Sequence, residues 1–311
     1  MDIEKINLGS TDVEITPLGV GTWAWGDRLF WSYGKTHTKD DIQAAFEISR
    51  AAGINFFDTA EFYGSGRSEK LLGESAGEGK QEIVTATKFM PFPWRLSRAS
   101  LLKALRKSLD RLGMSQVDLY QMHWPFPPVS IETWMEGLSD ALEAGFTRAV
   151  GVSNYNSYQM RRAHAALARR GIPLASNQVE YSLLHRAPED NGLWEACREL
   201  GVTLIAYSPL AQGLLTGKYT PDNQPQGLFR RINRRRLAAI QPLIENLREI
   251  GAAHGDKTPS QVALNWLMCK GAVPIPGAKN AHQAKENAGA LGWRLTSEQV
   301  AALDVASAEV Q

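Results

Sequence analysis

One short unit recurs five times along the chain and limits its possible folds more than any other feature. Each unit is a helical segment with an apolar stripe, then a glycine, then a run of β-prone apolar residues. The helical segments span residues 39–52, 100–112, 131–144, 158–170 and 193–200, and they end at Gly53, Gly113, Gly145, Gly171 and Gly201. Glycine at this place is typical of a helix that ends and leads into a strand. The repetition predicts an α/β protein in which helices and strands alternate.

Eight candidate strands alternate with the helical segments. They span residues 18–21, 55–58, 83–87, 117–121, 149–152, 174–178, 203–207 and 273–275. Their cores are almost continuously apolar, which is typical of parallel strands covered by helices. Eight such units in 311 residues favour a closed (β/α)8 TIM barrel over an open doubly wound sheet. Residues 4–7 and 12–15 predict an N-terminal β-hairpin. We also expect an extra C-terminal helix, with all of residues 1–311 in a single domain.

Chemically active side chains stand at the C-terminal ends of these strands. They are Asp58, Lys88, His123, Ser153 with Asn154, Gln178 and Tyr207, from the second to the seventh strand in order. A barrel collects its functional groups at this face, whereas an open sheet places them at one switch point. Because the groups are spread over six strands, they favour the barrel.

Charge and composition exclude several function classes. The chain has 34 basic and 33 acidic residues, a net charge of +1, so we expect no nucleic-acid partner and no anionic membrane surface. No stretch of 18 apolar residues or signal-peptide core occurs. Two cysteines are too few for a disulfide framework and indicate a reducing compartment. We expect a cytoplasmic monomer or weak homo-oligomer, and an organelle stroma stays open as the location.

Several well-known functional motifs are either absent from the sequence or lack the structural context that they require. Residues 19–24 match G-x-G-x-x-A after a strand, but an aromatic loop follows where a dinucleotide fingerprint needs a helix. No G-x-S-x-G occurs, so a nucleophile elbow is not expected. No Cys/His spacing indicates zinc, and we predict no metal site. Cys197 and Cys269 lie in helical patterns, as small core residues do.

Four side chains are expected to converge at one face of the barrel. A carboxylate after an apolar strand is costly unless paired, and Lys88 on the neighbouring strand can pair with Asp58. Tyr63 lies five residues after Asp58, and His123 ends the next strand. Each of these residues alone has an ordinary structural interpretation. Together they favour a catalytic site in which Lys88 stabilises the Tyr63 phenolate and lowers the tyrosine's pKa from about 10.

This tetrad resembles that of the aldo-keto reductases, which are (β/α)8 oxidoreductases that use NADPH without a Rossmann domain. The resemblance extends over almost the whole chain, through Gly151-Val-Ser-Asn154, Tyr207-Ser-Pro-Leu, Gly217-Lys218, Ile275-Pro-Gly-Ala-Lys279 and Glu286-Asn287. It implies reduction of an aldehyde or ketone to an alcohol. Tyr63 would be the general acid, Asp58 and Lys88 would tune it, and His123 would orient the carbonyl.

The resemblance also implies an NADPH site built from the loops after the strands. Ser153, Asn154 and Gln178 would hold the nicotinamide carboxamide, and Tyr207 would stack on the ring. The loop after the seventh strand would cradle the pyrophosphate, and residues after the eighth would surround the 2′-phosphate and adenine. The predicted cofactor residues are Gly21, Thr22, Trp23, Ser153, Asn154, Gln178, Tyr207, Ser208, Leu210, Gln212, Gly213, Lys218, Arg230, Gly277, Lys279, Gln283, Glu286 and Asn287.

Two further sequence features bear on function. Five arginines fall within residues 230–236, where either a solvated helix start or a contact of Arg230 or Arg231 with the 2′-phosphate is expected. Aromatic residues crowd the loops beside the tetrad. From these we predict a substrate pocket walled by Trp25, Trp31, Tyr33, Trp94 and Trp124.

The pattern resembles the bacterial and plant branch of the family, where pyridoxal reduction and methylglyoxal-type detoxification occur. A dedicated pyridoxal reductase is therefore one alternative to a general carbonyl reductase. A nucleotide-sensing binding subunit, resembling the potassium-channel β subunits of the same superfamily, is another.

Overall fold

Eight parallel strands form a sheet in the order β10-β9-β8-β7-β6-β5-β4-β3 in a computed structural model that describes residues 3–225 and 233–310. The strands are β3 (Val20–Gly21), β4 (Phe56–Asp58), β5 (Val84–Phe89), β6 (Val117–Met122), β7 (Thr147–Ser153), β8 (Leu174–Glu180), β9 (Thr203–Tyr207) and β10 (Val273–Pro274). The two ends of the sheet meet, because Gly19 N donates to Pro274 O at 3.0 Å and Gly21 N donates to Pro276 O at 3.1 Å. The sheet therefore closes, and the (β/α)8 TIM barrel is confirmed.

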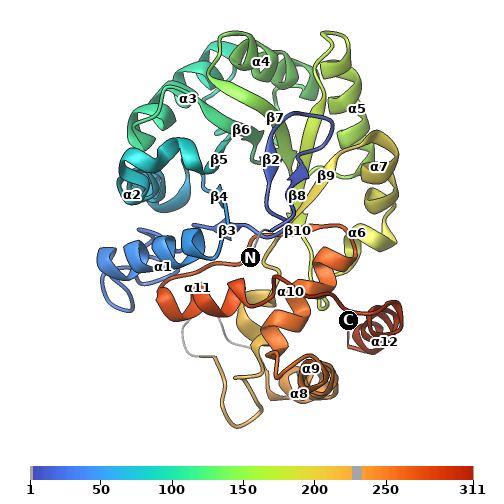
Figure 1. Ribbon diagram of the computed structural model, residues 1–311. Coiled ribbons are helices and arrows are strands. Elements are labelled where there is room, and N and C mark those ends of the chain that lie inside the picture. The colour runs from blue at the N-terminus through green and yellow to red at the C-terminus, as the bar shows by residue number, and fades with distance from the viewer. Residues whose placement is uncertain (1–2, 226–232, 311) are drawn as a thin grey trace.

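Helices surround the barrel as a ring (Figure 1). They are α1 (Lys39–Ala51), α2 (Arg67–Ala76), α3 (Arg98–Leu112), α4 (Ile131–Glu143), α5 (Ser157–Ala168), α6 (Ala187–Asp190), α7 (Leu193–Leu200), α8 (Arg234–Ala239), α9 (Gln241–Ala253), α10 (Pro259–Cys269) and α11 (Ala281–Ala288). The expected extra C-terminal helix is α12 (Ser297–Ala308). The five helices predicted from the sequence are all present, with boundaries that differ by up to two residues.

An antiparallel hairpin of β1 (Ile6–Asn7) and β2 (Glu14–Ile15) precedes the barrel, as predicted. It lies across one mouth of the barrel (Figure 1). Gly9 N donates to Thr203 Oγ1 at 2.7 Å, and a Cβ at Gly9 would lie only 2.5 Å from Ala175 O. The hairpin thus approaches the strands closely, and its Leu8 side chain joins the cluster inside the barrel.

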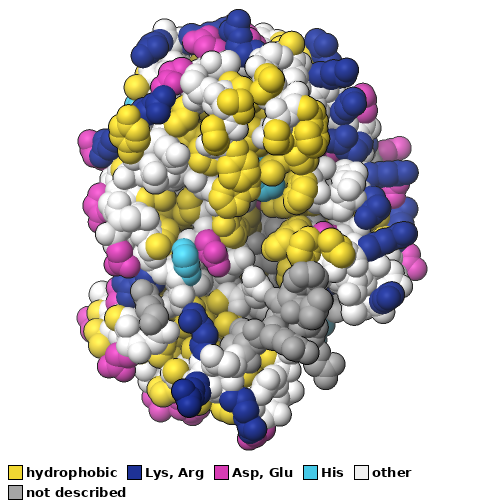
Figure 2. Space-filling view, turned by 180° about the vertical axis from the view of Figure 1, so that it is seen from behind, with side chains coloured by type: hydrophobic (Ala, Val, Ile, Leu, Met, Phe, Trp, Pro, Cys, Tyr) yellow, Lys and Arg dark blue, Asp and Glu magenta, His cyan; other side chains and the backbone are white. Residues whose placement is uncertain are grey.

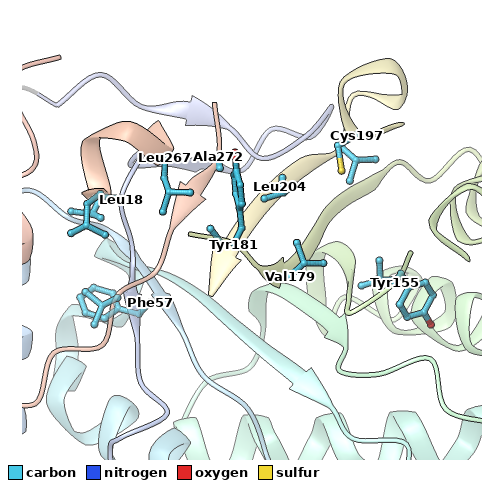
Figure 3. Close-up of a cluster of buried hydrophobic side chains, with 14 of the residues drawn as sticks. Leu18, Phe57, Tyr155, Val179, Tyr181, Cys197, Leu204, Leu267 and Ala272 are labelled. Carbon is cyan, nitrogen blue, oxygen red and sulfur yellow. The ribbon is translucent and has the colours of Figure 1, made fainter. Parts of the chain in front are cut away.

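Alternation along each strand separates two cores. Phe56 and Ile205 lie in the cluster inside the barrel, whereas their neighbours Phe57 and Leu204 lie in the cluster between strands and helices. Figure 3 shows part of the second cluster, where Leu204 lies near Val179 and Tyr181. Because side chains alternate with a period of two, the residue two positions after an inward-facing one also faces inward. The strands thereby carry functional groups into the open end of the barrel.

Candidate active site

Asp58 and Lys88 form a buried ion pair at the C-terminal ends of β4 and β5. Both lie two residues after an inward-facing apolar side chain, Phe56 or Ala86. Lys88 Nζ lies 2.5 Å from Asp58 Oδ2 and donates to Thr59 O at 2.8 Å. The Lys88 side chain is wholly buried and that of Asp58 is 2% exposed. A buried pair of this kind is held by the completeness of its hydrogen bonds.

Two amide side chains complete the surroundings of Asp58. Gln178 Nε2 donates to Asp58 Oδ1 at 2.8 Å, and Gln121 Nε2 donates to the same oxygen at 3.2 Å. Gln121 was missed at the sequence level. Its signal was its place on β6, two residues before His123 and therefore on the same inward face. Because Gln178 Nε2 donates to Asp58, the side-chain oxygen of Gln178 is the atom that could accept a hydrogen bond from a carboxamide N–H.

Tyr63 begins η1 (Tyr63–Gly66), a short 3-10 turn that brings its phenol back over the ion pair. Residues 64, 65 and 66 all have positive φ, between 55° and 87°. A Cβ at Gly64 would lie 2.8 Å from Gly26 O, so the turn needs glycine there. Lys88 Nζ donates to Tyr63 Oη at 3.3 Å, and the His123 ring meets the tyrosine ring edge-on at 5.7 Å. The four predicted tetrad residues therefore lie together.

Burial determines the electrostatics of the tetrad. It raises the pKa of Tyr63 well above 10, and the Asp58 carboxylate adds to the rise. This direction is opposite to our prediction, because burial and the Asp58 carboxylate both disfavour the phenolate. Desolvation also lowers the pKa of Lys88, against the pull of Asp58. For His123, burial and then the Lys88 charge lower the pKa to about 3. At neutral pH the site thus presents a phenol and a neutral imidazole.

The tetrad opens into a cavity of about 410 Å³ at the C-terminal face of the barrel. Asp58, Tyr63 and His123 line it, whereas Lys88 lies beneath its floor. Most of the predicted cofactor residues line the same cavity: Gly21, Trp23, Ser153, Asn154, Gln178, Tyr207, Ser208, Leu210, Gln212, Gly213, Lys218, Gly277, Lys279, Gln283, Glu286 and Asn287. The sequence analysis missed further lining residues, namely Ala24, Phe62, Met90, Pro209, Thr216, Ser260, Ile275 and Pro276.

The cavity wall after β9 and β10 suits a dinucleotide. Ser208, Ala211, Gln212 and Gly213 all have positive φ, so the backbone after β9 turns sharply along the cavity wall. Ala211 N and Gly213 N donate to Ser208 O and Leu210 O within this loop. Further along, Lys279 precedes α11, whose N-cap Asn280 accepts from Gln283 N. Cations and helix N-termini favour phosphates. Ser153 and Gln178 supply hydroxyl and amide groups beside the tetrad, so the donor set fits a nicotinamide dinucleotide.

Asn154 already uses its polar atoms within the protein. Its Nδ2 donates to His123 O at 3.0 Å and to Ser153 Oγ at 3.1 Å, and its Oδ1 accepts from Tyr207 Oη at 3.0 Å. These bonds join the ends of β6, β7 and β9. Asn154 therefore holds the Tyr207 ring and the His123 main chain in place, besides lining the cavity.

Four residues that we predicted to contact the cofactor or the substrate do not line the cavity. Thr22 is fully buried, bonded through its hydroxyl to Asp58 O and Ser68 Oγ, and does not line the cavity. Trp25 is also fully buried in the core, where its Nε1 donates to Ala278 O at 2.8 Å. Tyr33 packs edge-on against His37 instead of facing the pocket. Trp94 is 72% exposed and lies outside the cavity. Of the predicted pocket, Trp31 and Trp124 line it.

The arginine run is divided by the limits of the described chain. Arg230 and Arg231 lie outside the described residues. Arg234, Arg235 and Arg236 are exposed and open α8, as a solvated helix start does. Within residues 3–225 and 233–310, no group of three or more His, Cys, Asp or Glu side chains is placed to hold a metal ion. None of the described helices is both long and apolar enough to span a membrane.

Comparison with known proteins settles the family. A sequence model described as the Aldo/keto reductase family matches residues 17–308. The chain belongs to this family. Its fold is thus that of an oxidoreductase family whose members generally use a nicotinamide cofactor.

Among the relatives of this aldo-keto reductase is the chloroplastic pyridoxal reductase of Arabidopsis thaliana. The two are 45% identical over 98% of this chain and 86% of the plant protein. A thermostable aldo-keto reductase solved in complex with the inhibitor epalrestat superimposes with a TM-score of 0.80 at 30% identity, covering 98% of this chain and all of the other. The glycerol dehydrogenase of Gluconobacter oxydans gives 0.83 at 27% identity, over 99% and 96% of the two chains.

Proposed function

We propose that this protein reduces aldehydes or ketones to alcohols with NADPH, and that Tyr63 is the proton donor. One observation carries the proposal. Tyr63 lines the dinucleotide-type cavity, and Lys88 Nζ, which does not line it, lies 3.3 Å from the Tyr63 hydroxyl. A phenol with a raised pKa keeps its proton at neutral pH, as a general acid must.

Each residue of the tetrad has a distinct role in the proposed reaction. NADPH held in this cavity would supply the hydride that the carbonyl carbon accepts. Tyr63 donates its proton to the carbonyl oxygen, and Lys88 stabilises the phenolate that remains. Asp58, held by Gln121 and Gln178, keeps Lys88 under the tyrosine. Neutral His123, whose ring lies against that of Tyr63, orients the carbonyl.

The activity is tested with 4-nitrobenzaldehyde by loss of NADPH absorbance. Turnover at a rate proportional to enzyme supports a reductase. Tight NADPH binding without turnover would instead favour the nucleotide-sensing subunit, as in the potassium-channel β subunits. The complete tetrad supports the reductase, because a sensor has no need of a proton donor.

The choice of NADPH over NADH rests on the segment before α11. Lys279 and the first turn of α11 face the cavity, and only NADPH has a 2′-phosphate for them. Each charge-assisted hydrogen bond contributes about 1.5–3 kcal/mol, so two such bonds give NADPH an advantage of about two to four orders of magnitude. The advantage should shrink as salt rises.

Quenching of tryptophan fluorescence measures both affinities, since Trp23 and Trp31 line the cavity. Lys279→Glu should weaken NADPH binding far more than NADH binding. Lys285→Glu, an exposed change on the same helix, is the matched control for charge. Equal affinities of the wild type for the two nucleotides would contradict this assignment.

Pyridoxal is the second candidate substrate, because the 45% identical plant relative is a pyridoxal reductase. A panel of pyridoxal, methylglyoxal and sugar aldehydes at equal concentration separates it from general carbonyl reduction. A dedicated pyridoxal reductase should favour pyridoxal by at least about 100-fold in kcat/KM over the other aldehydes. Comparable values across the panel support the general reductase.

A further inference from the structure

A second buried carboxylate lies on the other face of the strand that carries Lys88. Glu69, in the first turn of α2, is fully buried and accepts a hydrogen bond from Thr87 Oγ1 at 2.6 Å. On β5, Ala86 belongs to the cluster inside the barrel and Phe89 to the cluster between strands and helices. Because side chains alternate along a strand, Lys88 faces the inside of the barrel and Thr87 faces the helices. Glu69 and Lys88 therefore flank one strand from opposite sides.

Arg111 of α3 supplies the positive charge that a buried carboxylate needs. Its Nε donates to Glu69 Oε2 at 2.5 Å, and its Nη2 donates to Ser108 Oγ at 3.0 Å. The arginine side chain also packs against the last residue of the η1 turn, since a Cβ at Gly66 would lie 2.6 Å from Arg111 Cδ. The ion pair thus joins α2, α3 and the turn that begins with Tyr63.

The start of α2 is bonded to strand ends and has no side-chain N-cap. Thr59 Oγ1 donates to Ser68 Oγ at 2.9 Å, and Ser68 Oγ donates to Thr22 O at 2.9 Å. Glu69 continues this series through its bond with Thr87. These bonds reach the ends of β3, β4 and β5, so they fix the η1 turn that directly precedes α2.

The charges near Lys88 come from several elements. Asp58 ends β4, Tyr63 begins η1, His123 follows β6, and Glu69 lies on α2. Burial lowers the pKa of Lys88, and the carboxylates of Asp58 and then Glu69 oppose this shift. Glu69 therefore helps to keep the buried lysine in its charged form.

On the outer side of the strands, each carboxylate is matched by an arginine. The pairs are Glu61 with Arg95 and Glu69 with Arg111, and all four charges act on Tyr120 of β6. Burial, more than these charges, raises the pKa of Tyr120 well above 10, so its phenol stays neutral. Removing one partner of a pair therefore changes the local charge by one unit.

We propose that Glu69 is a positioning residue, which acts through Lys88 to keep an ammonium group beside the Tyr63 hydroxyl. Arg111 limits the strength of this effect, because it cancels part of the Glu69 charge. Neither Glu69 nor Arg111 lines the cavity. The inference rests on the proposed function and adds a residue to its machinery.

The test uses two variants that break the same ion pair and change the charge in opposite directions. Glu69→Gln removes a negative charge, which should lower the pKa of Lys88. Arg111→Gln removes a positive charge, which should raise it. A role in packing alone predicts no difference in sign, because both variants lose the same contact.

The pKa of Lys88 is measured by NMR on full-length protein labelled with ¹³C at the lysine ε-carbon. Loss of one signal in Lys88→Met assigns the resonance. Each single variant should move the midpoint by at least about 0.5 pH unit, down for Glu69→Gln and up for Arg111→Gln. The double variant loses both charges and should titrate close to the wild type.

Two control variants separate charge from packing. Thr87→Val removes a hydrogen bond to Glu69 and keeps both charges, so the Lys88 midpoint should stay within about 0.2 pH unit of the wild type. Figure 2 shows Lys and Arg side chains gathered along the right-hand edge, to which the turn from Figure 1 brings α2 and α3. Lys107→Gln removes an exposed charge of α3, which water screens, and should leave the midpoint equally unchanged.

Kinetics on the same preparations connect the pair to the reaction. The alkaline limb of the kcat profile for 4-nitrobenzaldehyde should move to lower pH in Glu69→Gln and to higher pH in Arg111→Gln. A limb that stays in place in both variants would overturn the role in the reaction.

The NMR titration needs no turnover, so it separates this proposal from the proposed function. Opposite shifts of the Lys88 midpoint in the two single variants support the proposal even if no aldehyde is reduced. Shifts in the same direction, or none, would overturn it, whereas turnover by the wild type would leave the reductase assignment intact.

Discussion

Asp58 is the residue on which the chemistry of the site depends. It is buried and accepts hydrogen bonds from Lys88, Gln121 and Gln178. The sequence predicted the lysine, because a carboxylate and an ammonium at neighbouring strand ends must pair. It did not reveal that Gln121 and Gln178 bind Asp58, since these bonds depend on the distances between strands in the closed barrel.

Replacing Lys88 tests this arrangement. Lys88→Met removes the cation beside Tyr63 and leaves a buried Asp58 with amide donors alone. We expect kcat to fall by about 10²–10⁴-fold and the free energy of unfolding to fall by about 3–5 kcal/mol. Urea unfolding and steady-state rates measure the two effects.

Two further variants separate charge from packing. Lys103→Met, at an exposed position on α3, should change neither kcat nor the free energy of unfolding by much. Asp58→Asn combined with Lys88→Met should recover stability without activity, because it removes both buried charges. An active Lys88→Met protein with wild-type stability would contradict the buried pair.

His123 predicts a particular dependence of stability on pH. The folded imidazole has a pKa of about 3, whereas the unfolded one titrates near 6.5. Between these values the unfolded state binds the extra proton, so the free energy of unfolding falls as pH decreases. The slope from this group is at most about 1.4 kcal/mol per pH unit.

Urea unfolding of the wild type and of His123→Asn between pH 7 and 4 isolates the contribution of His123 to the pH dependence of the free energy of unfolding. The two stability curves should converge towards low pH, because only the wild type loses this term. In NMR spectra, the His123 ring signal should not titrate between pH 5 and 8. Parallel curves, or a His123 signal with a midpoint near 6.5, would show that the imidazole has the same pKa in the folded and unfolded protein and would contradict this account.

At the scale of elements, Asp304 makes several of the polar contacts that attach α12 to the barrel, beside the buried Leu303 and the bond from Arg186 to Ser307 Oγ. Asp304 Oδ1 accepts from Trp266 Nε1 at 2.9 Å, Lys270 Nζ donates to its carboxylate at 3.1 Å, and Arg186 donates to its main-chain oxygen at 2.6 Å. Lys270 also pairs with Glu189 at 2.9 Å. The helix is thereby linked to α6 and α10.

Asp304→Ala should lower the free energy of unfolding by about 1–3 kcal/mol, because it leaves the Trp266 N–H without this acceptor. Val305→Ala, at a 65% exposed position on the same helix, should change it by less than about 0.5 kcal/mol. Thermal and urea unfolding of both variants measure the difference. Equal stability of the two variants would show that Asp304 contributes nothing to the attachment.

Sequence patterns predicted some elements better than others. Helices with a clear stripe and a terminal glycine were found, whereas α2 was missed, because its ten residues have little apolar content beyond Leu71 and Leu72 and no side-chain N-cap. Loops were harder. Trp25 and Trp94 occur in similar aromatic surroundings in sequence, yet one is buried in the core, where it is bonded to Ala278, and the other is exposed. Tertiary contacts alone distinguish them.

At the scale of the whole molecule, closure of the barrel assembles the site. Main-chain bonds from Gly19 and Gly21 join the first and last strands, so loops from both ends of the chain share one cavity. The sequence predicted the fold and the tetrad because strand ends and residue chemistry are local. The direction of the Tyr63 pKa shift could not be obtained in this way, because desolvation depends on the assembled protein.

The central claim, that Tyr63 donates the proton in an NADPH-dependent reduction, is tested most directly by Tyr63→Phe. The kcat for 4-nitrobenzaldehyde and the NADPH dissociation constant are measured on the same preparation. We predict that kcat falls by at least about 100-fold while the NADPH dissociation constant stays within about twofold, because the phenol contacts the carbonyl and not the nucleotide phosphates. A variant that keeps more than about a tenth of the wild-type kcat would contradict the assignment of Tyr63 as the acid.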